Sequence, residues 1–91
     1  MSKQSILQPD EKKCYLTGST LNLDKHHIFN GPNRDWSDKE GLWVWLNHDV
    51  HMAIHQHRPD LARELKEAGQ RAYEREHSRE EFMRHVRKNY L

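Results

Sequence analysis

Four histidines in the middle of the chain have the spacing of a metal site, and the fold must bring three of them together if they bind one ion. His26 and His27 are adjacent in a short β-like run, and His51 and His55 lie four positions apart in a segment that can be helical. Residues i and i+4 share one face of a helix, so His51 and His55 can reach one ion. Neighbouring strand residues point to opposite faces, so one of His26 and His27 can join them. Three ligands beside a fourth imidazole are typical of an open, catalytic metal site rather than a closed, structural one.

The composition describes a small domain that a bound ion would help to stabilise. Of the 91 residues, 34% are hydrophobic and 32% are charged, so the apolar core must be thin for a single domain over residues 1–91. Metal binding to the folded form adds to folding stability in such a chain. Cys14 is the only cysteine, which excludes an internal disulfide and a four-cysteine zinc site.

Charge and hydropathy limit the partners. The net charge is +1 with the histidines neutral, so any nucleic-acid surface must come from a local cluster of basic residues rather than from an overall positive field. Residues 1–12 form a polar lead-in without the apolar run of a signal peptide. No apolar stretch reaches the roughly 18 residues of a membrane-spanning helix. We therefore expect an intracellular, cytoplasmic protein with no membrane partner.

The first half of the chain predicts strands that flank a long loop. Residues 42–46 are five aromatic or branched residues without glycine or proline, which indicates a mostly buried strand. Asn47 or Asp49 can cap a following helix, which Pro59 is expected to stop. Further strands are predicted at residues 14–16 and 21–29, with a turn at 17–20 and a loop from 30 to 41.

The second half predicts two helices. Apolar residues recur at close to 3.6-residue spacing between 61 and 76. Asp60 is the expected N-cap of this helix, and Gly69 is expected to weaken its interior. Ser78 and Glu81 have the spacing of a capping box, which predicts a further helix directly after them. The residues of that helix that can pack inward are Phe82, Met83 and Val86.

The order of these features resembles the HNH endonuclease superfamily, also called ββα-metal or His-Me finger nucleases. The doubled histidine, the intervening loop and strand, and the later histidine pair occur in the order of that family. The resemblance implies a ββα-metal finger core, made of two short strands, a long loop and a helix, at about residues 14–57. With a helical C-terminal extension at about residues 60–90, the expected fold class is α+β.

A wider string of residues resembles small HNH proteins encoded by phages and prophages. The resemblance covers about residues 14–55 and implies a metal-dependent DNA endonuclease from such a source. The end of the chain, residues 87–91, is also similar. The string consists of Cys14, Gly18, residues 26–29, Gly31, Asn33, Arg34, Ser37, residues 41–44, Leu46 and His51.

The resemblance also implies a role for each histidine. In HNH nucleases with a doubled histidine, the first ligates the metal and the second is the general base, which implies His26 as ligand and His27 as base. His51 and His55 would complete the metal site. Arg34 follows the base strand closely, where a guanidinium can hold a phosphate oxygen. One divalent ion is expected, and Zn, Mg, Mn and Ni all stay open.

One part of the family pattern is missing. The family's middle Asn opens the second strand and braces the loop that orients the base, but its place falls near Leu42, which cannot do this. Asn33, Ser37 or Asn47 can substitute from elsewhere. The zinc-ribbon cysteines of many HNH proteins are also missing, since Cys14 stands alone.

The expected partner is DNA, bound mainly through its phosphate backbone. The densest basic cluster is Arg84, Arg87 and Lys88, and these are the predicted nucleic-acid contacts. Arg58 and Arg63 are further candidates. The sequence leaves open whether the protein acts as a monomer, as a homodimer or within a larger phage complex.

Two other functions fit the same residues. The metal can be structural in a non-catalytic module that binds nucleic acid or protein, and an active enzyme can act on RNA instead of DNA. Several single residues also have two interpretations. They are Asp24 (strand residue or ligand), Asp49 (helix cap or partner of a ligand imidazole), His48 and His57 (surface residues or partners of a ligand), and Trp43 and Trp45 (core residues or base-stacking platforms).

Overall fold

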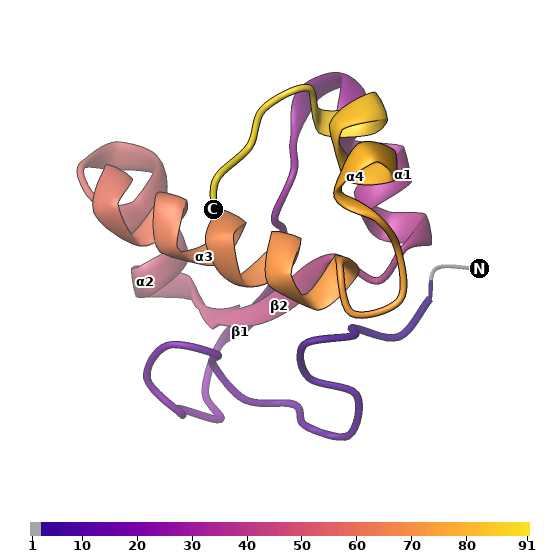
Figure 1. The fold of residues 1–91 in the computed structure, drawn as a ribbon. Helices are drawn as coiled ribbons and strands as arrows, with labels where there is room; N and C mark the ends of the chain where they lie inside the picture. The colour runs from indigo at the N-terminus through magenta and orange to yellow at the C-terminus, as the bar shows by residue number, and fades with distance from the viewer. Residues whose placement is uncertain (1–2) are drawn as a thin grey trace.

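The computed structural model describes residues 3–91, in which the strand that carries the doubled histidine pairs with the tryptophan-rich strand (Figure 1). Strand β1 (Leu23–His27) and strand β2 (Trp43–Asn47) form a two-stranded antiparallel sheet, with His26 opposite Val44 and His27 opposite Trp43. Residues 1–2, which belong to the predicted domain, lie outside the described residues.

The register sorts the side chains of the sheet into two faces. Directly opposed residues of antiparallel strands point to the same side, and successive residues alternate. We call one side the histidine face; it carries Asp24, His26, Val44 and Leu46. We call the other side the tryptophan face; it carries Lys25, His27, Trp43 and Trp45. The doubled histidine is therefore divided between the two faces, as strand geometry predicts.

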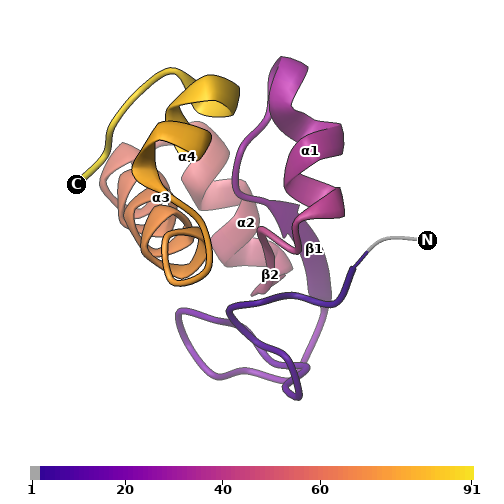
Figure 2. The ribbon, with the colours of Figure 1, turned by 45° about the vertical axis from the view of Figure 1, so that its right-hand side comes forward.

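Within residues 3–91 the chain forms four α-helices, so the fold is of the α+β class. A 3-10 turn, η1 (Gly31–Asn33), and helix α1 (Arg34–Lys39) connect the two strands. Helix α2 (His48–Gln56) follows β2 without a linker and contacts both strands. Helices α3 (Pro59–Tyr73) and α4 (Arg79–Val86) follow. Figures 1 and 2 show α4 beside α1, where the rings of Trp36 and His85 stack with centroids 4.6 Å apart.

The hydrophobic core joins the sheet to the helices of both halves. Val44 and Leu46 of the histidine face are fully buried and belong to the same apolar cluster as Leu65 of α3 and Phe82 of α4. Helix α3 packs closely against Ile28 at Gly69, where an added Cβ would lie 3.1 Å from a methyl carbon of the Ile28 side chain. The glycine that costs helix propensity therefore allows close packing.

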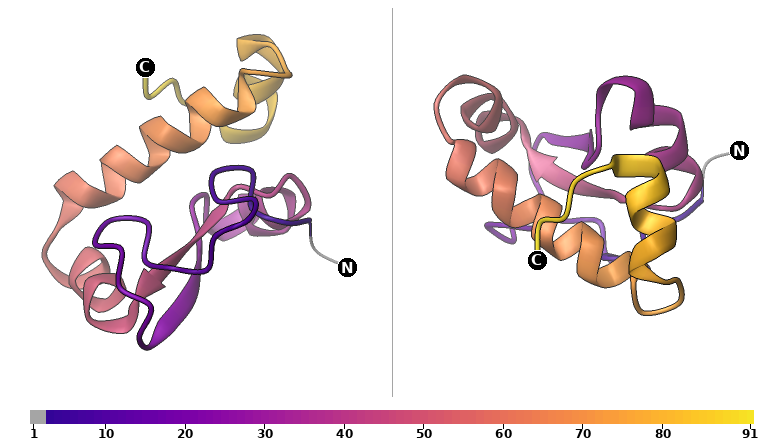
Figure 3. Two further views of the ribbon diagram at one scale, coloured as in Figure 1. Left: turned by 90° about the horizontal axis from the view of Figure 1, so that it is seen from below. Right: turned by 45° about the horizontal axis from the view of Figure 1, so that its top comes forward.

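The N-terminal segment packs along β2 rather than extending as a free lead-in. Ser5 Oγ donates to the carbonyl of Trp43 at 2.5 Å, and the Trp45 N–H donates to Gln8 Oε1 at 2.9 Å. Leu7 of this segment lines a hollow together with Ala68 and Ala72 of α3, and in Figure 3, left, the segment passes between the strands and α3. Gly41 is required beneath it, because its φ is +71° and a Cβ would lie 2.3 Å from the Gln4 carbonyl oxygen.

The structure differs from the sequence prediction in the first half at three places. Residues 14–16 form a turn instead of a strand, closed by a 2.8 Å bond from the Gly18 N–H to the Cys14 carbonyl. The strand predicted over 21–29 is limited to β1. The predicted loop at 30–41 contains η1 and α1. The sequence does not predict this short helix because no apolar periodicity marks its six residues, of which only Ser37 is buried.

The boundary between α2 and α3 also differs. Pro59 does not only stop a helix; it occupies the first turn of α3, where its missing N–H is not needed. Asp60 is therefore inside the helix and is not its cap, and its carboxylate accepts two hydrogen bonds from the guanidinium of Arg58. Helix α3 ends at Tyr73, and residues 74–76 form a turn.

The other helix starts agree with the sequence. Asn47 caps α2 by accepting from the Asp49 N–H at 3.0 Å. Ser78 caps α4 by accepting from the Glu81 N–H at 3.1 Å, and the Glu81 carboxylate reaches back to the Ser78 backbone. No helix within residues 3–91 has the length and apolar character needed to cross a membrane.

Candidate metal centre and the histidine beside it

Three imidazoles converge on the histidine face, one from β1 and two from α2. The ring nitrogens that His26, His51 and His55 can offer all lie within 4.8 Å of one another. The two Nε2 atoms of His51 and His55 are 3.1 Å apart. The local cause is the direct passage from β2 into the Asn47-capped helix α2, which places the His51–His55 face over His26. The predicted gathering of these three residues is confirmed.

The three imidazoles fit a small divalent ion. In a tetrahedral zinc site with bonds of about 2.0–2.1 Å, two ligand nitrogens lie about 3.3 Å apart. The 3.1 Å separation of the Nε2 atoms of His51 and His55 is close to that spacing. Imidazole ligands suit zinc, copper and nickel better than magnesium. Three such ligands leave one tetrahedral position for a substrate or water.

Asp24 orients one of the three imidazoles. Its Oδ2 atom lies 3.1 Å from Nδ1 of His51 and 2.7 Å from Nδ1 of His48. Accepting the Nδ1 proton of His51 leaves the Nε2 lone pair free to face the other two histidines. The hydrogen bonds from His48 and His51 hold the pKa of the Asp24 carboxyl below its usual value. Asp24 is two positions before His26 in a strand, a spacing that places both on one face.

His26 is the most buried of the three histidines. Its exposed fraction is 5%, and its partner across the sheet, Val44, is fully buried. Burial, followed by the neighbouring charges of His51 and His55, lowers the pKa of His26 to about 4. The imidazole is therefore neutral near pH 7, which is the form that binds a metal.

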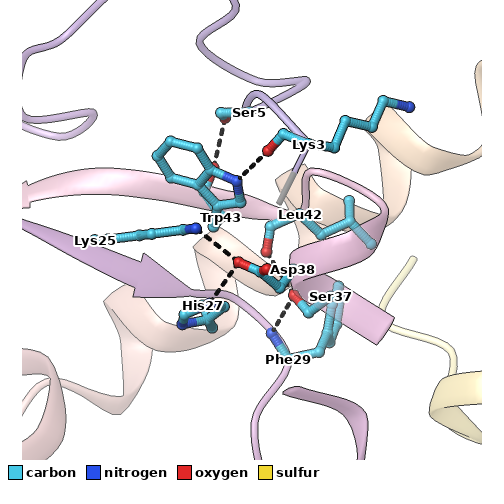
Figure 4. Close-up of polar contacts among 9 residues, drawn as sticks. All are labelled: Lys3, Ser5, Lys25, His27, Phe29, Ser37, Asp38, Leu42 and Trp43. Atoms are coloured by element: carbon cyan, nitrogen blue, oxygen red, sulfur yellow. Dashed lines mark hydrogen bonds and ion pairs between the residues drawn. The ribbon is translucent and has the colours of Figure 1, made fainter. Parts of the chain in front are cut away.

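His27 lies on the tryptophan face, on the opposite side of the sheet from these three rings. Its Nε2 atom is 3.0 Å from Oδ1 of Asp38, and the same oxygen accepts a 2.6 Å hydrogen bond from Nζ of Lys25 (Figure 4). The bond from Lys25, together with that from His27, lowers the pKa of Asp38. Asp38 was absent from the sequence prediction because it was placed in a loop, and helix α1 is what brings it to His27.

Arg34 lies on the same side as His27. It is the first residue of α1 and is exposed, and it lines a shallow hollow together with His27, Lys25 and Asp38. The structure thus places the predicted phosphate-binding arginine beside the predicted base. Both roles stay predictions.

Ser37 connects the strand ends that the missing Asn would brace. Its hydroxyl is fully buried, donates to the Leu42 carbonyl at 2.6 Å and accepts from the Phe29 N–H at 3.4 Å (Figure 4). Phe29 follows β1 and Leu42 precedes β2, so one side chain connects both ends of the intervening loop. Asn47 is occupied as the cap of α2, and no side-chain cap bond is formed by Asn33.

The predicted basic cluster is divided among three settings. Arg84 pairs with Glu80 on the exposed surface of α4, with a 3.1 Å separation. Arg87 ends α4 in the left-handed conformation, with φ 62°. Lys88 is placed over the ring of Tyr90, with Nζ 5.1 Å from the ring centroid. The three side chains therefore have different local partners, and their role as nucleic-acid contacts stays a prediction.

The other residues for which the sequence left two interpretations lie outside the three-histidine cluster. His57 is exposed at the end of α2, and Asp49 is exposed in its first turn. His48 is bound to Asp24 at the surface. Trp43 is buried with 8% exposure, and its indole N–H donates to the Lys3 carbonyl at 2.9 Å.

No known protein assigns a role to these residues by similarity. The convergence of the three histidines and the contact between Asp38 and His27 are the observations from which a function can be argued. A comparison of the chain with protein-family models, with curated proteins and with solved structures found no match.

Proposed function

We propose that the chain is a metal-dependent DNA endonuclease of the HNH type, with a ββα-metal core formed by β1, β2 and α2. The observation that carries the proposal is the convergence of His26, His51 and His55 from a strand and a following helix. A fourth imidazole, His27, is the next residue along the strand and is held by a carboxylate. This is the ligand and base arrangement that the resemblance to HNH nucleases implies.

Each residue has a part in phosphodiester hydrolysis. When bound, a divalent ion supplies positive charge to a phosphate oxygen and to the departing 3′ oxygen. His27 takes the proton of the attacking water. Asp38 accepts the Nε2 proton of His27, so that Nδ1 carries the lone pair, and its charge stabilises the imidazolium that forms. Arg34 holds a non-bridging phosphate oxygen. The products carry 5′-phosphate and 3′-hydroxyl ends.

The position of β1 supports access from both faces. Among residues 3–91, β1 has β2 as its only partner strand, so no further strand pairs with its other edge. A phosphate at that edge is flanked by the three ligands on the histidine face and by His27 and Arg34 on the tryptophan face. The division of the doubled histidine between two faces is then a functional feature, because the base and the metal must approach the phosphate from different directions.

One observation favours a second candidate function. The sheet separates His27 from the three-histidine site, and Asp38 and Lys25 already form a closed polar contact with one another beside it. This arrangement also suits a non-catalytic module in which the metal stabilises the fold and His27 is a structural residue. The two functions differ in what the substitution His27→Ala changes.

A plasmid-nicking assay tests the proposal. Metal-stripped protein is supplied with Mg, Mn, Ni or Zn one at a time, and supercoiled DNA is followed on a gel. His27→Ala is expected to keep its metal content and melting temperature while nicking falls by about 100-fold or more, the usual contribution of a general base. His57→Ala, an exposed histidine outside the site, is the matched control and should nick at the wild-type rate.

Two results contradict the proposal. The first is tight binding of an ion by the wild-type protein without nicking under any ion, which points to the structural module. The second is nicking that His27→Ala leaves unchanged, which removes His27 as the base. Parallel digests of single-stranded RNA and of single- and double-stranded DNA determine the substrate class, and cleavage confined to RNA overturns the assignment to DNA.

A further inference from the structure

Three positive side chains surround the ring of Tyr90 near the end of the chain. The Cζ atom of Arg63 lies 5.9 Å from the ring centroid, and the Nζ atoms of Lys66 and Lys88 lie 5.6 and 5.1 Å from it. Distances of up to about 6 Å are those of cation–π contacts. We call Arg63, Lys66, Lys88 and Tyr90 the cation cluster. Two of its charges come from α3, while Lys88 and Tyr90 come from the C-terminal segment.

The C-terminal segment is held against α3 by a buried glutamine. Gln70 is fully buried, and its amide donates to Oδ1 of Asn89 at 2.8 Å. Its Oε1 atom accepts the Tyr90 N–H at 2.8 Å, and the Tyr90 ring lies 6.2 Å from that of Phe29. Figure 1 and Figure 3, right, show the segment returning along α3 after α4. The ring around which the cations gather is therefore held in place by the fold.

The cation cluster adjoins the three-histidine site. Lys66 lines a single hollow together with His26 and His55. Lys66 therefore belongs both to the surroundings of the candidate metal centre and to the cation cluster, and the positive surface extends outward from the site.

The charges of the cluster are only partly neutralised within the protein. Arg63 pairs with Glu67 at 3.2 Å. Lys66 and Lys88 have no carboxylate partner within residues 3–91. The whole chain has a net charge of only +1, so this concentration is local. Like charges held close together repel one another, and a bound polyanion relieves that repulsion.

We propose that the cation cluster binds the phosphate backbone of DNA next to the three-histidine site; the choice of DNA as the polyanion rests on the proposed function. Any two of the three charges lie within about 12 Å of each other, a span along which a duplex carries several phosphate charges. The contact is with the backbone, so it gives affinity without sequence preference. It replaces Arg84 and Arg87 as the main contacts and keeps Lys88.

The test measures DNA binding separately from cleavage. Zinc-loaded protein carrying His27→Ala is titrated into a fluorescent duplex at several salt concentrations, and the intact duplex is verified afterwards. Lys66→Gln with Lys88→Gln is expected to weaken binding and to lower the slope of log affinity against log salt by nearly two, about 0.9 for each phosphate contact. Lys13→Gln, on the N-terminal segment and paired with Glu11, removes one charge elsewhere and should leave the slope unchanged.

Two substitutions of Tyr90 control for the possibility that a variant binds DNA less tightly only because it has unfolded. Tyr90→Phe keeps the cation–π contacts, whereas Tyr90→Leu removes them. Tyr90→Leu is expected to weaken DNA binding more than Tyr90→Phe, with both proteins keeping their zinc. Equal binding by the parent His27→Ala protein, the double lysine variant and the two Tyr90 variants overturns the proposal, as does the absence of DNA binding by the parent protein at low salt.

The outcomes separate this proposal from the function it rests on. Salt-dependent binding that the lysine variants reduce, without nicking by the wild-type protein under any ion, supports the surface and removes the nuclease. Nicking by the wild-type protein, with a salt slope that the lysine variants leave unchanged, removes the surface and keeps the nuclease.

Discussion

Oδ1 of Asp38 lies 3.0 Å from Nε2 of His27, and this contact joins a helix of the loop to the strand that carries the doubled histidine. If His27 is the base, Asp38 positions it. Asp38→Asn keeps the size of the side chain and a carbonyl acceptor but removes the charge that stabilises the imidazolium. We expect kcat for nicking to fall by about tenfold or more with KM unchanged.

The control for Asp38→Asn is Asp10→Asn, an exposed residue of the N-terminal segment outside the hollow that His27 lines. Zinc content should be wild-type in both variants. A fall in KM and kcat together, or equal losses in both variants, would show that Asp38 does not position the base.

Removal of one metal ligand should lower metal content and thermal stability together. A ligand at 100 times its Kd stabilises the folded state by about 2.7 kcal/mol, which corresponds to about 10–20 °C in the melting temperature of a domain of this size. His55→Ala and His51→Ala should lose most of that increase on zinc addition. His57→Ala should keep it. A full zinc response in both ligand variants would rule out the three-histidine site.

The metal-free protein should lose stability as the pH falls from about 6.5 to 4. The folded pKa of His26 is about 4, below the unfolded value of about 6.5, so the unfolded chain binds more protons in this window. Stability therefore rises with pH across it and is lost on acidification, by up to about 3 kcal/mol for His26. The charges around the ring are His51 and His55 of α2, Lys66 of α3 and His27.

Urea unfolding of the metal-free protein at pH 7, 6 and 5 checks this prediction. His26→Gln should show a flatter dependence of the free energy of unfolding on pH than the wild type. If the two curves run parallel, protonation of His26 does not limit acid stability.

Ser37→Ala should destabilise the fold independently of any function. The change leaves the buried Leu42 carbonyl and Phe29 N–H without the hydroxyl that serves both. A cost of about 1–3 kcal/mol is expected, measured by denaturant unfolding. Thr20→Ala, at an exposed position, should cost less than about 0.5 kcal/mol. Equal stability of both variants would show that Ser37 does not brace the loop.

Arg34→Ala should slow nicking without changing zinc binding. Loss of a charge-assisted phosphate contact corresponds to about 1.5–3 kcal/mol, or roughly 10- to 100-fold in kcat/KM. Arg34→Lys should recover only part of the rate, because an ammonium cannot form the bidentate contact. Wild-type rate and salt dependence in Arg34→Ala would mean that Arg34 does not touch the phosphate.

Helices α2, α3 and α4, and the faces on which the four histidines lie, follow from patterns that act over short distances. Helix caps at Asn47 and Ser78 are visible in the sequence because each is completed within three residues. His51 and His55 share a face because four positions nearly complete a helical turn, and His26 and His27 separate because strand residues alternate. The sequence could therefore predict which residues belong together on each element.

Tertiary packing decided which residues meet around the candidate site. Asp38, Ser37 and Lys66 reach their partners only when α1 and α3 fold back onto the sheet, and no local periodicity marks such distant pairs. The basic residues Arg84, Arg87 and Lys88 are close in sequence, but the left-handed turn at Arg87 sends the chain back along α3 and places Lys88 beside Tyr90 instead. Spacing along the chain determines the faces of single elements, whereas long-range packing determines which faces meet.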